Sequence, residues 1–250
     1  MRKIAWVTGA GKGIGRATAL LLARKGWHVA ASARTEEDLV ALQCEAAEGS
    51  IEIFPLDVTD LPATLEVVTK IGQKLGPIQL AILNAGTHKP FQALNFSVDD
   101  FRQLVETNVM GTVHGLASIL PEFLERKSGH VAIVASVAGY RGLPSAAAYG
   151  CTKAGLINLA EALKPELDEA GIKLSLINPG FVKTPLTDQN DFPMPELITA
   201  DAAADYIVRG LSSNKFEITF PWRFATLMRI LRFCPDWIFF RITRRMVRTS

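Results

Sequence analysis

Long apolar runs are missing from this sequence of 250 residues. None approaches the roughly 18 residues that an apolar helix needs to cross a bilayer. The opening stretch, MRKIAWVTGAGKGIG, reaches glycines too soon to contain the apolar centre of a signal peptide. We therefore expect a cytoplasmic protein, with at most peripheral contact to a membrane surface.

Cysteine and histidine are also scarce. The three cysteines lie far apart and lack the spacing of metal ligands, which predicts free thiols in a reducing compartment. No pair of histidines has metal-ligand spacing, so we expect surface or core side chains and no metal site. The four histidines are His28, His88, His114 and His130.

Negative charge is almost absent from the end of the chain. Residues 221–250 hold seven arginines and one acidic residue, Asp236, and so carry +6, while the whole chain carries only +2. The preceding residues are therefore acidic overall. Nothing in the basic end is typical of a nucleic-acid-binding motif, so we expect no nucleic-acid partner.

Short β-rich runs alternate with longer helical patterns, and no internal linker interrupts them. The runs are nearly continuous in apolar residues, which is typical of strands buried on both faces. They cover residues 3–8, 28–33, 51–56, 79–84, 130–136, 172–178 and 216–221. The alternation predicts an α/β fold, a doubly wound parallel sheet with right-handed crossovers. We expect residues 1–221 to form this domain and residues 222–250 to form a C-terminal helical extension.

A glycine loop links the first expected strand to the first expected helix. In VTGAGKGIGRA, Gly9, Gly13 and Gly15 allow a sharp turn and a close approach of the backbone to a pyrophosphate. The following helix would offer its N-terminal N–H groups to that anion. A dinucleotide is the cofactor that this arrangement predicts.

Two cations near this loop bear on which dinucleotide is bound. A carboxylate at the end of the second strand would accept a hydrogen bond from a ribose 2′-OH, whereas arginine there accommodates a 2′-phosphate. The chain has Arg34 at this point and no acidic residue before Glu36, and Lys12 lies inside the loop. These residues favour NADP(H) over NAD(H).

Tyr149 and Lys153 lie four residues apart in a helical pattern and so share one helix face. A tyrosine has a pKa near 10 and is a poor base at neutral pH, but a nearby ammonium group lowers that pKa. Ser136 ends an apolar strand, where its hydroxyl would face the same cleft. This constellation is typical of acid–base chemistry on a small molecule.

Taken together, these motifs resemble the classical short-chain dehydrogenase/reductase (SDR) family over about residues 3–220. The similarity covers TGAGKGIG, LDV, NAG, TNVMG, VASVAG, YGCTK and NPGFVKT, in that order. It implies a single Rossmann-like domain that acts as an oxidoreductase. It also implies a homo-oligomer and a small carbonyl or alcohol substrate.

The resemblance assigns roles residue by residue. Tyr149 would exchange a proton with the substrate oxygen, Ser136 would hydrogen-bond that oxygen, and Lys153 would lower the tyrosine pKa and bind the nicotinamide ribose. Asn108 would hold a water on a proton path to Lys153. The residues implied to bind the cofactor are Gly9, Lys12, Gly13, Ile14, Gly15, Arg34, Asp57, Val58, Asn84, Ala85, Gly86, Tyr149, Lys153, Pro179, Gly180, Val182 and Thr184.

Substrate choice in this family depends on the segment after NPGFVKT and on the C-terminus. Here the former contains Phe192, Pro193 and Met194 and predicts an apolar flap, followed by a helix that Thr199 would cap. An apolar flap favours a lipophilic substrate. A 3-oxoacyl thioester reductase and a non-catalytic NADP(H)-binding sensor or scaffold remain the alternatives.

The extension itself reads as two amphipathic helices separated by Pro235. The first would place Phe224, Leu227, Met228 and Leu231 on one face, and Asp236 would cap the second. Three interpretations stay open. The helices pack on the body or a partner subunit, lie on an anionic lipid surface, or dock another protein.

Overall fold

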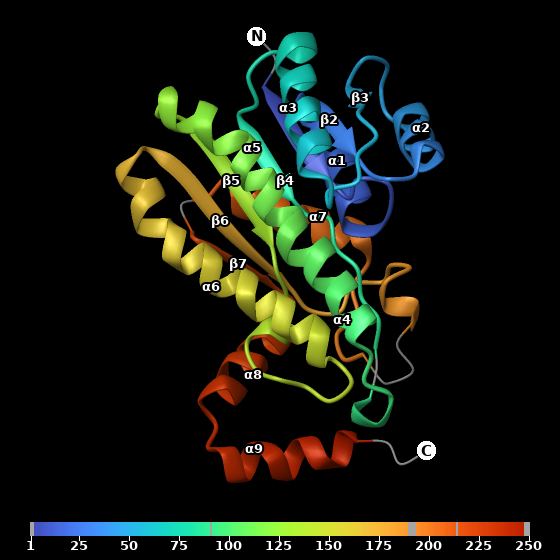
Figure 1. Ribbon diagram of the computed structural model, residues 1–250, viewed down its shortest axis with the longest axis vertical. Coiled ribbons are helices and arrows are strands. Elements are labelled where there is room, and N and C mark those ends of the chain that lie inside the picture. Colours follow the sequence, from blue (N-terminus) through green and yellow to red (C-terminus); the bar gives the residue numbers. More distant parts are fainter. Residues whose placement is uncertain (1–2, 91, 190–193, 214, 248–250) are drawn as a thin grey trace.

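In the computed structural model, residues 3–90, 92–189, 194–213 and 215–247 are described, and within them seven strands form one parallel sheet (Figure 1). The strand order is β3-β2-β1-β4-β5-β6-β7. The strands are β1 (Ile4–Thr8), β2 (His28–Ser32), β3 (Ile51–Ile53), β4 (Leu80–Leu83), β5 (Gly129–Val134), β6 (Ile172–Pro179) and β7 (Glu217–Phe220). The predicted fold class is confirmed, and every expected run overlaps one of these strands.

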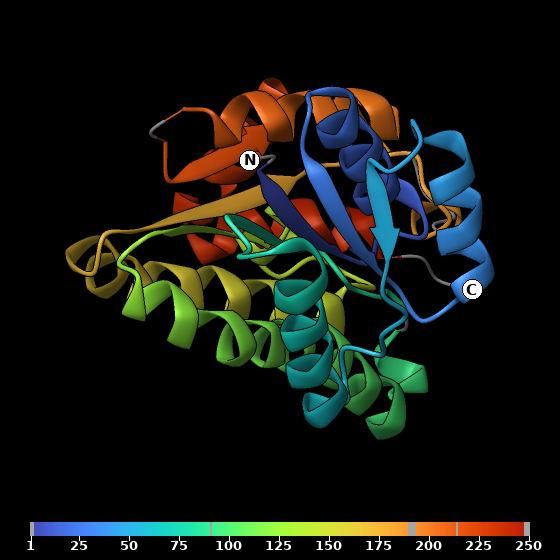
Figure 2. The same ribbon diagram turned by 90° about the horizontal axis from the view of Figure 1, so that it is seen from above.

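Helices cover both faces of the sheet, as Figure 2 shows from above. One face carries α1 (Gly13–Arg24) and α7 (Ala200–Leu211), with α2 (Glu36–Glu45) beside them. The other carries α3 (Leu61–Leu75), α5 (Gly111–Glu125) and α6 (Ala147–Glu169). The short α4 (Val98–Leu104) leads through a π-helical turn, Val105–Met110, into α5. Thr199 caps α7 as expected, because its side chain accepts a hydrogen bond from the Ala202 N–H.

The expectation of right-handed crossovers is wrong for the last one. The chain moves in one direction along the sheet from β4 to β5, β6 and β7, and α5 and α6 make the first two crossings on one face. However, α7 makes the third crossing on the opposite face, where it packs against α1. Its hand is therefore reversed. The long connection at 180–199 allows this, and the crossing buries Ala203 and Ile207 in the core that α1 also covers.

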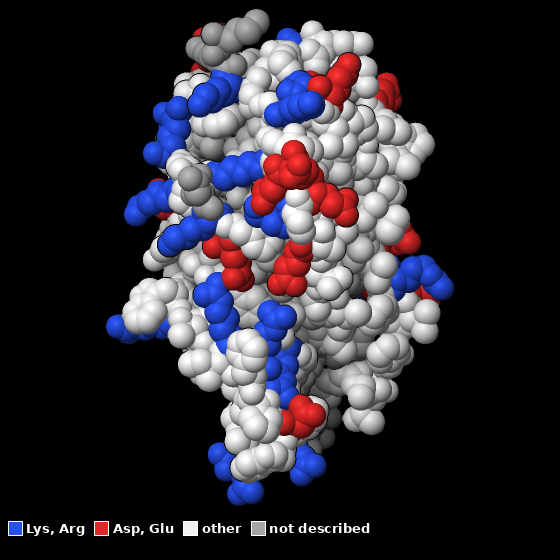
Figure 3. All heavy atoms as spheres, turned by 90° about the vertical axis from the view of Figure 1, so that its left-hand side faces the viewer, with Lys and Arg blue, Asp and Glu red and all other residues white. Residues whose placement is uncertain are grey.

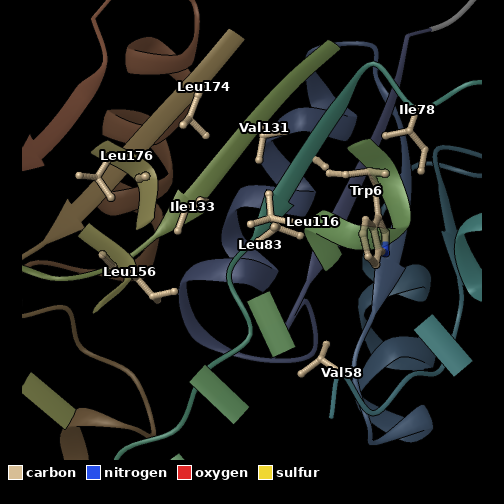
Figure 4. Packing of buried hydrophobic residues seen from close by; sticks show 14 of the residues in the cluster. Trp6, Val58, Ile78, Leu83, Leu116, Val131, Ile133, Leu156, Leu174 and Leu176 are labelled. Atoms are coloured by element: carbon tan, nitrogen blue, oxygen red, sulfur yellow. The ribbon is translucent and has the colours of Figure 1, made fainter. Parts of the chain in front are cut away.

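The larger apolar core lies between the sheet and α3, α5 and α6 (Figure 4). Because the strands are parallel and in register, residues at one level point to the same face. Trp6 pairs with Ala81, Ala81 with Val131, and Val131 with Leu174, and all four are buried in this core. The Trp6 indole N–H donates to the Ser32 hydroxyl at 3.0 Å, so its burial leaves no polar atom unpaired.

The C-terminal extension forms α8 (Trp222–Phe233) and α9 (Asp236–Thr243), which continues into a short turn of helix, η5 (Arg244–Met246). Ala225 and Met228 of α8 join the larger core, and Phe224 and Leu231 pack at its edge. The predicted apolar face is wrong at Leu227, which is exposed. Among the described residues, no helix is both long and apolar enough to cross a membrane.

Asp236 does not cap α9 as expected. The helix begins at Asp236 itself, after Pro235, and makes no side-chain cap. Instead, the Asp236 carboxylate accepts a hydrogen bond from Arg141 at 2.6 Å. The Asp236 carboxylate is therefore bound by Arg141, from the loop after β5, and not by the backbone N–H groups of α9 as the sequence pattern predicts.

Two neighbouring residues of α8 provide a test of its packing. Met228→Ala should lower the free energy of unfolding by about 2–5 kcal/mol, because Met228 is 2% exposed and its removal leaves a cavity. Leu227→Ala should change it by no more than about 0.5 kcal/mol, because Leu227 is exposed. Urea unfolding of the two variants measures both values. Equal losses would show that α8 packs through another face.

Candidate active site

The loops that follow β1 and β4 meet where the strand order reverses, at the carboxyl edge of the sheet. Asn84 joins them: its side-chain amide donates to the carbonyl oxygens of Thr8 at 3.0 Å and Gly9 at 3.3 Å. The Thr8 hydroxyl in turn accepts from the backbone N–H groups of Asn84 and Ala85. In open α/β sheets, ligands bind in the crevice at this switch point.

The glycine loop leaves no space for side chains on its inner side. A Cβ at Gly9 would lie 2.9 Å from both the Ala85 Cα and the Asn84 amide nitrogen, and a Cβ at Gly15 would collide with the Gly9 carbonyl oxygen. A Cβ at Gly13 would lie 2.9 Å from Thr184. The loop, the segment after β4 and the segment after β6 are therefore packed together.

The N-terminus of α1 suits a bound anion. Lys12 is its N-cap and makes no side-chain cap, and the first turn contains no acidic residue. The first N–H groups, at Gly13, Ile14 and Gly15, consequently lie at the positive end of the helix dipole, next to the loop. These residues fit the pyrophosphate of a dinucleotide.

The region expected to bind the 2′-phosphate holds one acidic residue that sequence reasoning missed. The Lys12 ammonium lies 3.2 Å from the Asp38 carboxylate, and a Cβ at Gly11 would lie 3.0 Å from the Asp38 Cβ. Arg34 is exposed and directly follows Ala33, whose Cβ would lie 3.3 Å from a Cβ at Gly11. Asp38 follows Arg34 by four residues in the next helix, and only the fold brings it back to the loop.

The segment that is expected to bind adenine follows β3, one strand further out in the sheet. The Asp57 carboxylate accepts from the backbone N–H of Thr59 at 3.0 Å and from its hydroxyl at 2.9 Å. Asp57 is exposed while Val58 is buried, with its side chain against Gly111. The Asp57 carboxylate thus stabilises the turn through Val58 and Thr59 and remains exposed to solvent.

Ser136 is buried at the end of β5 and connects two loops. Its hydroxyl accepts from the Ala138 N–H at 3.1 Å and donates to the Pro179 carbonyl at 3.3 Å. Gly180 lies next to Pro179, and its N–H donates to Phe220 of β7 at 2.7 Å. Val182, buried further along this loop, forms a β-bridge with Ile198.

Tyr149 and Lys153 lie on the same face of α6, with the Lys153 ammonium 5.6 Å from the centre of the tyrosine ring. Lys153 is 4% exposed and donates to the Val134 carbonyl at 2.9 Å. Burial lowers the pKa of Lys153 to about 8. Burial also raises the pKa of Tyr149, while its hydrogen bond with Ser136 acts in the opposite direction.

Asn108 is fully buried in the π-helical turn and holds the segment after β4. Its amide oxygen accepts from the Thr87 N–H at 2.7 Å, and its amide nitrogen donates to the Thr87 carbonyl and the Thr152 hydroxyl, both at 3.0 Å. A Cβ at Gly86 would lie 3.3 Å from the Asn108 amide oxygen and 3.6 Å from the Lys153 nitrogen. The structure therefore brings the side chains of Asn108 and Lys153 together next to Gly86.

His88 was not expected in the site. Its ring packs edge-on against the Tyr149 ring with 4.7 Å between centroids. The one signal in the sequence was its position two residues after the NAG segment. Of the predicted flap, Phe192 and Pro193 lie outside the described residues, and Met194 is partly buried.

Comparison with known proteins adds independent findings. The family model described as short chain dehydrogenase matches residues 3–193. An uncharacterized oxidoreductase of Myxococcus xanthus (strain DK1622) is 38% identical over 246 residues, which cover 98% of this chain and 97% of the relative.

Two solved structures share the fold. A short chain dehydrogenase/reductase of Burkholderia phymatum in complex with NAD has a TM-score of 0.84 at 24% identity, and the match covers 91% of this chain and 92% of that one. ElxO with NADP bound has a TM-score of 0.78 at 27% identity, covering 88% of this chain and 98% of that one.

The lowered pKa of Lys153 predicts a pH dependence of stability. Between pH 8 and 10.5, unfolded Lys153 still binds a proton that the folded side chain has released, so stability rises with pH. From pH 7 to pH 10, wild type without cofactor should gain about 2.5 kcal/mol relative to Lys153→Met, measured by urea unfolding. The exposed-site control Lys25→Met should show almost none of this change. A constant difference between wild type and Lys153→Met would contradict a buried ammonium group.

Proposed function

Since the chain belongs to the short-chain dehydrogenase family, we propose that it is an NADP(H)-dependent oxidoreductase that interconverts a carbonyl and an alcohol. The observation that carries the proposal is the convergence of Ser136, Tyr149 and Lys153 beside an anion-binding helix N-terminus. A purely binding protein has no need of a buried lysine next to a partly buried tyrosine, because burying an ammonium group is costly. This argues against the sensor or scaffold alternative.

The residues present fit a dinucleotide. The glycine loop and the N-terminus of α1 would hold its pyrophosphate, Asp57 its adenine, and Lys153 its nicotinamide ribose. When bound, this cofactor supplies or accepts the hydride. Thr184, which lies against Gly13, would meet the cofactor from the β6 side.

The protein's own contribution is the proton. Burial keeps the Tyr149 phenol protonated at neutral pH, and this is the form that donates to a carbonyl oxygen during reduction. Ser136 would hydrogen-bond the same oxygen and stabilise its developing charge. The Lys153 ammonium, charged below a pKa of about 8, would favour the phenolate that remains after the proton has left.

The choice of NADP(H) is supported by Arg34 and Lys12, and by the NADP bound to ElxO. Lys12 already pairs with Asp38, so Arg34 is the cation with the greater capacity for a 2′-phosphate. The substrate is proposed to be lipophilic, because the C-terminal extension leaves apolar side chains exposed at this edge of the sheet. A 3-oxoacyl thioester reductase stays the alternative within the same chemistry.

Tyr149→Phe should lower kcat by at least about a hundredfold, because it removes the transferred proton. The dissociation constant of NADPH should change by no more than about twofold, since the ring and its packing remain. NADPH oxidation with a panel of ketones and aldehydes measures the first value, and fluorescence titration the second. Substantial residual turnover in this variant would overturn the assignment of Tyr149.

Arg34→Ser should weaken NADPH binding about tenfold and leave NADH binding nearly unchanged, because only NADPH carries the 2′-phosphate. The control Arg24→Ser removes an exposed arginine at the C-terminal end of α1, away from the glycine loop. It should change the affinity for neither NADPH nor NADH. Fluorescence titration of both cofactors against both variants gives the answer. Equal wild-type affinity for NADH and NADPH would contradict the proposed preference.

A further inference from the structure

The outer surface of α8 and α9 is both apolar and basic. Nine of the eighteen large apolar side chains that are exposed among the described residues come from residues 222–247. They are Trp222, Leu227, Ile230, Phe233, Trp237, Phe240, Ile242, Met246 and Val247. We call the exposed side chains of residues 222–247 the tail surface. Patches this apolar on a soluble fold mark interaction sites.

Arginines stand among these apolar side chains. Six lie within residues 222–247, and Asp236 is the one acidic residue there. On the outward side of α9 and η5, Trp237 neighbours Arg241, Arg244 and Arg245 at helical spacing, and all four are exposed. Figure 3 shows Lys and Arg side chains set among uncharged ones at the narrow lower end of the molecule.

Arg141 holds the tail surface in a fixed position. It donates to the Leu231 carbonyl at 2.7 Å and to the Asp236 carboxylate at 2.6 Å. Its guanidinium group also lies 3.8 Å from the centre of the Phe239 ring. One arginine thus binds the end of α8 and the start of α9, and the two helices are presented as a shaped surface.

A second connection runs through Glu217 of β7. Its carboxylate accepts from Arg229 of α8, from the Tyr140 hydroxyl, and from the Asn178 amide at 2.7 Å. Burial, and then the hydrogen bond to Glu217, raise the pKa of Tyr140, so this hydroxyl keeps its proton. Through these side chains, α8 is joined to the first residue of β7 and to the carboxyl end of β6.

Both connections end beside the proposed catalytic groups. Tyr140 and Arg141 follow Ser136 in the loop after β5, and Asn178 precedes Pro179, which accepts from Ser136. The ring of Phe224 lies 5.1 Å from that of Phe181 in the loop after β6. Figure 1 places α8 and α9 below the carboxyl edge of the sheet, the edge at which these loops lie.

We propose that the tail surface docks on an anionic lipid bilayer, with the carboxyl edge of the sheet toward the membrane. Tryptophan and phenylalanine enter the headgroup boundary, and arginines pair with anionic headgroups. The acidic body, at the other end, stays in water. Docking itself does not depend on the proposed function, whereas delivery of a lipophilic carbonyl from the bilayer does.

A second copy of the chain fits this surface less well. A two-fold interface places the same patch on both subunits, so Arg241, Arg244 and Arg245 would face their own copies. The carboxylate within the patch, Asp236, is already paired with Arg141. Like charges brought together without counter-charges oppose association, while anionic lipid supplies the counter-charge.

The test is co-sedimentation of the full-length protein with vesicles. Binding is expected to phosphatidylcholine vesicles that contain an equal part of phosphatidylglycerol, and only weak binding to phosphatidylcholine alone. The triple variant Arg241→Gln, Arg244→Gln, Arg245→Gln should lower partitioning roughly a hundredfold, because each arginine near the surface contributes roughly fivefold. The variant Phe233→Ser, Trp237→Ser should weaken binding to both vesicle types.

Matched controls change the same chemistry elsewhere. Arg24→Gln, Lys25→Gln, Lys127→Gln alters equal charge at the amino edge of the sheet, and Leu65→Ser, Leu124→Ser alters exposed apolar residues on α3 and α5. Both controls should bind like wild type, and unchanged thermal unfolding should show that every variant folds.

Three outcomes would overturn the proposal. The first is no binding of folded wild type to anionic vesicles, and the second is an equal loss in the charge control. The third is self-association, seen by analytical ultracentrifugation, that the tail variants abolish while no vesicle is bound. Turnover of a water-soluble ketone is measured separately, so a failure of the proposed oxidoreductase activity is distinguishable from a failure to dock.

Discussion

Lys153 keeps its ammonium group inside the protein, and several features of the fold follow from that. Its nitrogen donates to the last residue of β5, Val134, so α6 must cross close to the carboxyl end of that strand. A Cβ at Gly139 would lie 2.7 Å from the Lys153 carbonyl carbon, so the loop after Ser136 touches the backbone of α6 itself. The helix, the loop and the strand end thereby hold the serine, tyrosine and lysine in one place.

The C-terminal extension is joined to the same place from the other side. Glu217 connects α8 to Tyr140 and Asn178, and Arg141 connects both tail helices to the loop that follows Ser136. In the second link, the Arg141 guanidinium group also packs against the Phe239 ring, 3.8 Å from its centre. The extension therefore buries one side near the loops after β5 and β6 and leaves the other side, with most of its arginines, exposed.

Much of the fold could be predicted because its signals are local. Continuous apolar runs identified the strands, and ordered motifs identified the loops at the strand ends. The failures occurred where a distant residue competes with a local one. Asp236 is bound by Arg141 and does not cap α9, α8 packs through Ala225 and Met228 while Leu227 stays exposed, and His88 lies against Tyr149 of α6.

The sequence by itself determined the chemistry of the candidate site, because the residue types and their spacing carry that information: a glycine loop between strand and helix, and a tyrosine four residues before a lysine. Only the tertiary structure decided the hand of the last crossover, the pairing of Lys12 with Asp38, and which side of the tail meets water. Each of these depends on packing between segments far apart in the chain. The residue pattern within one segment does not show which other segments pack against it.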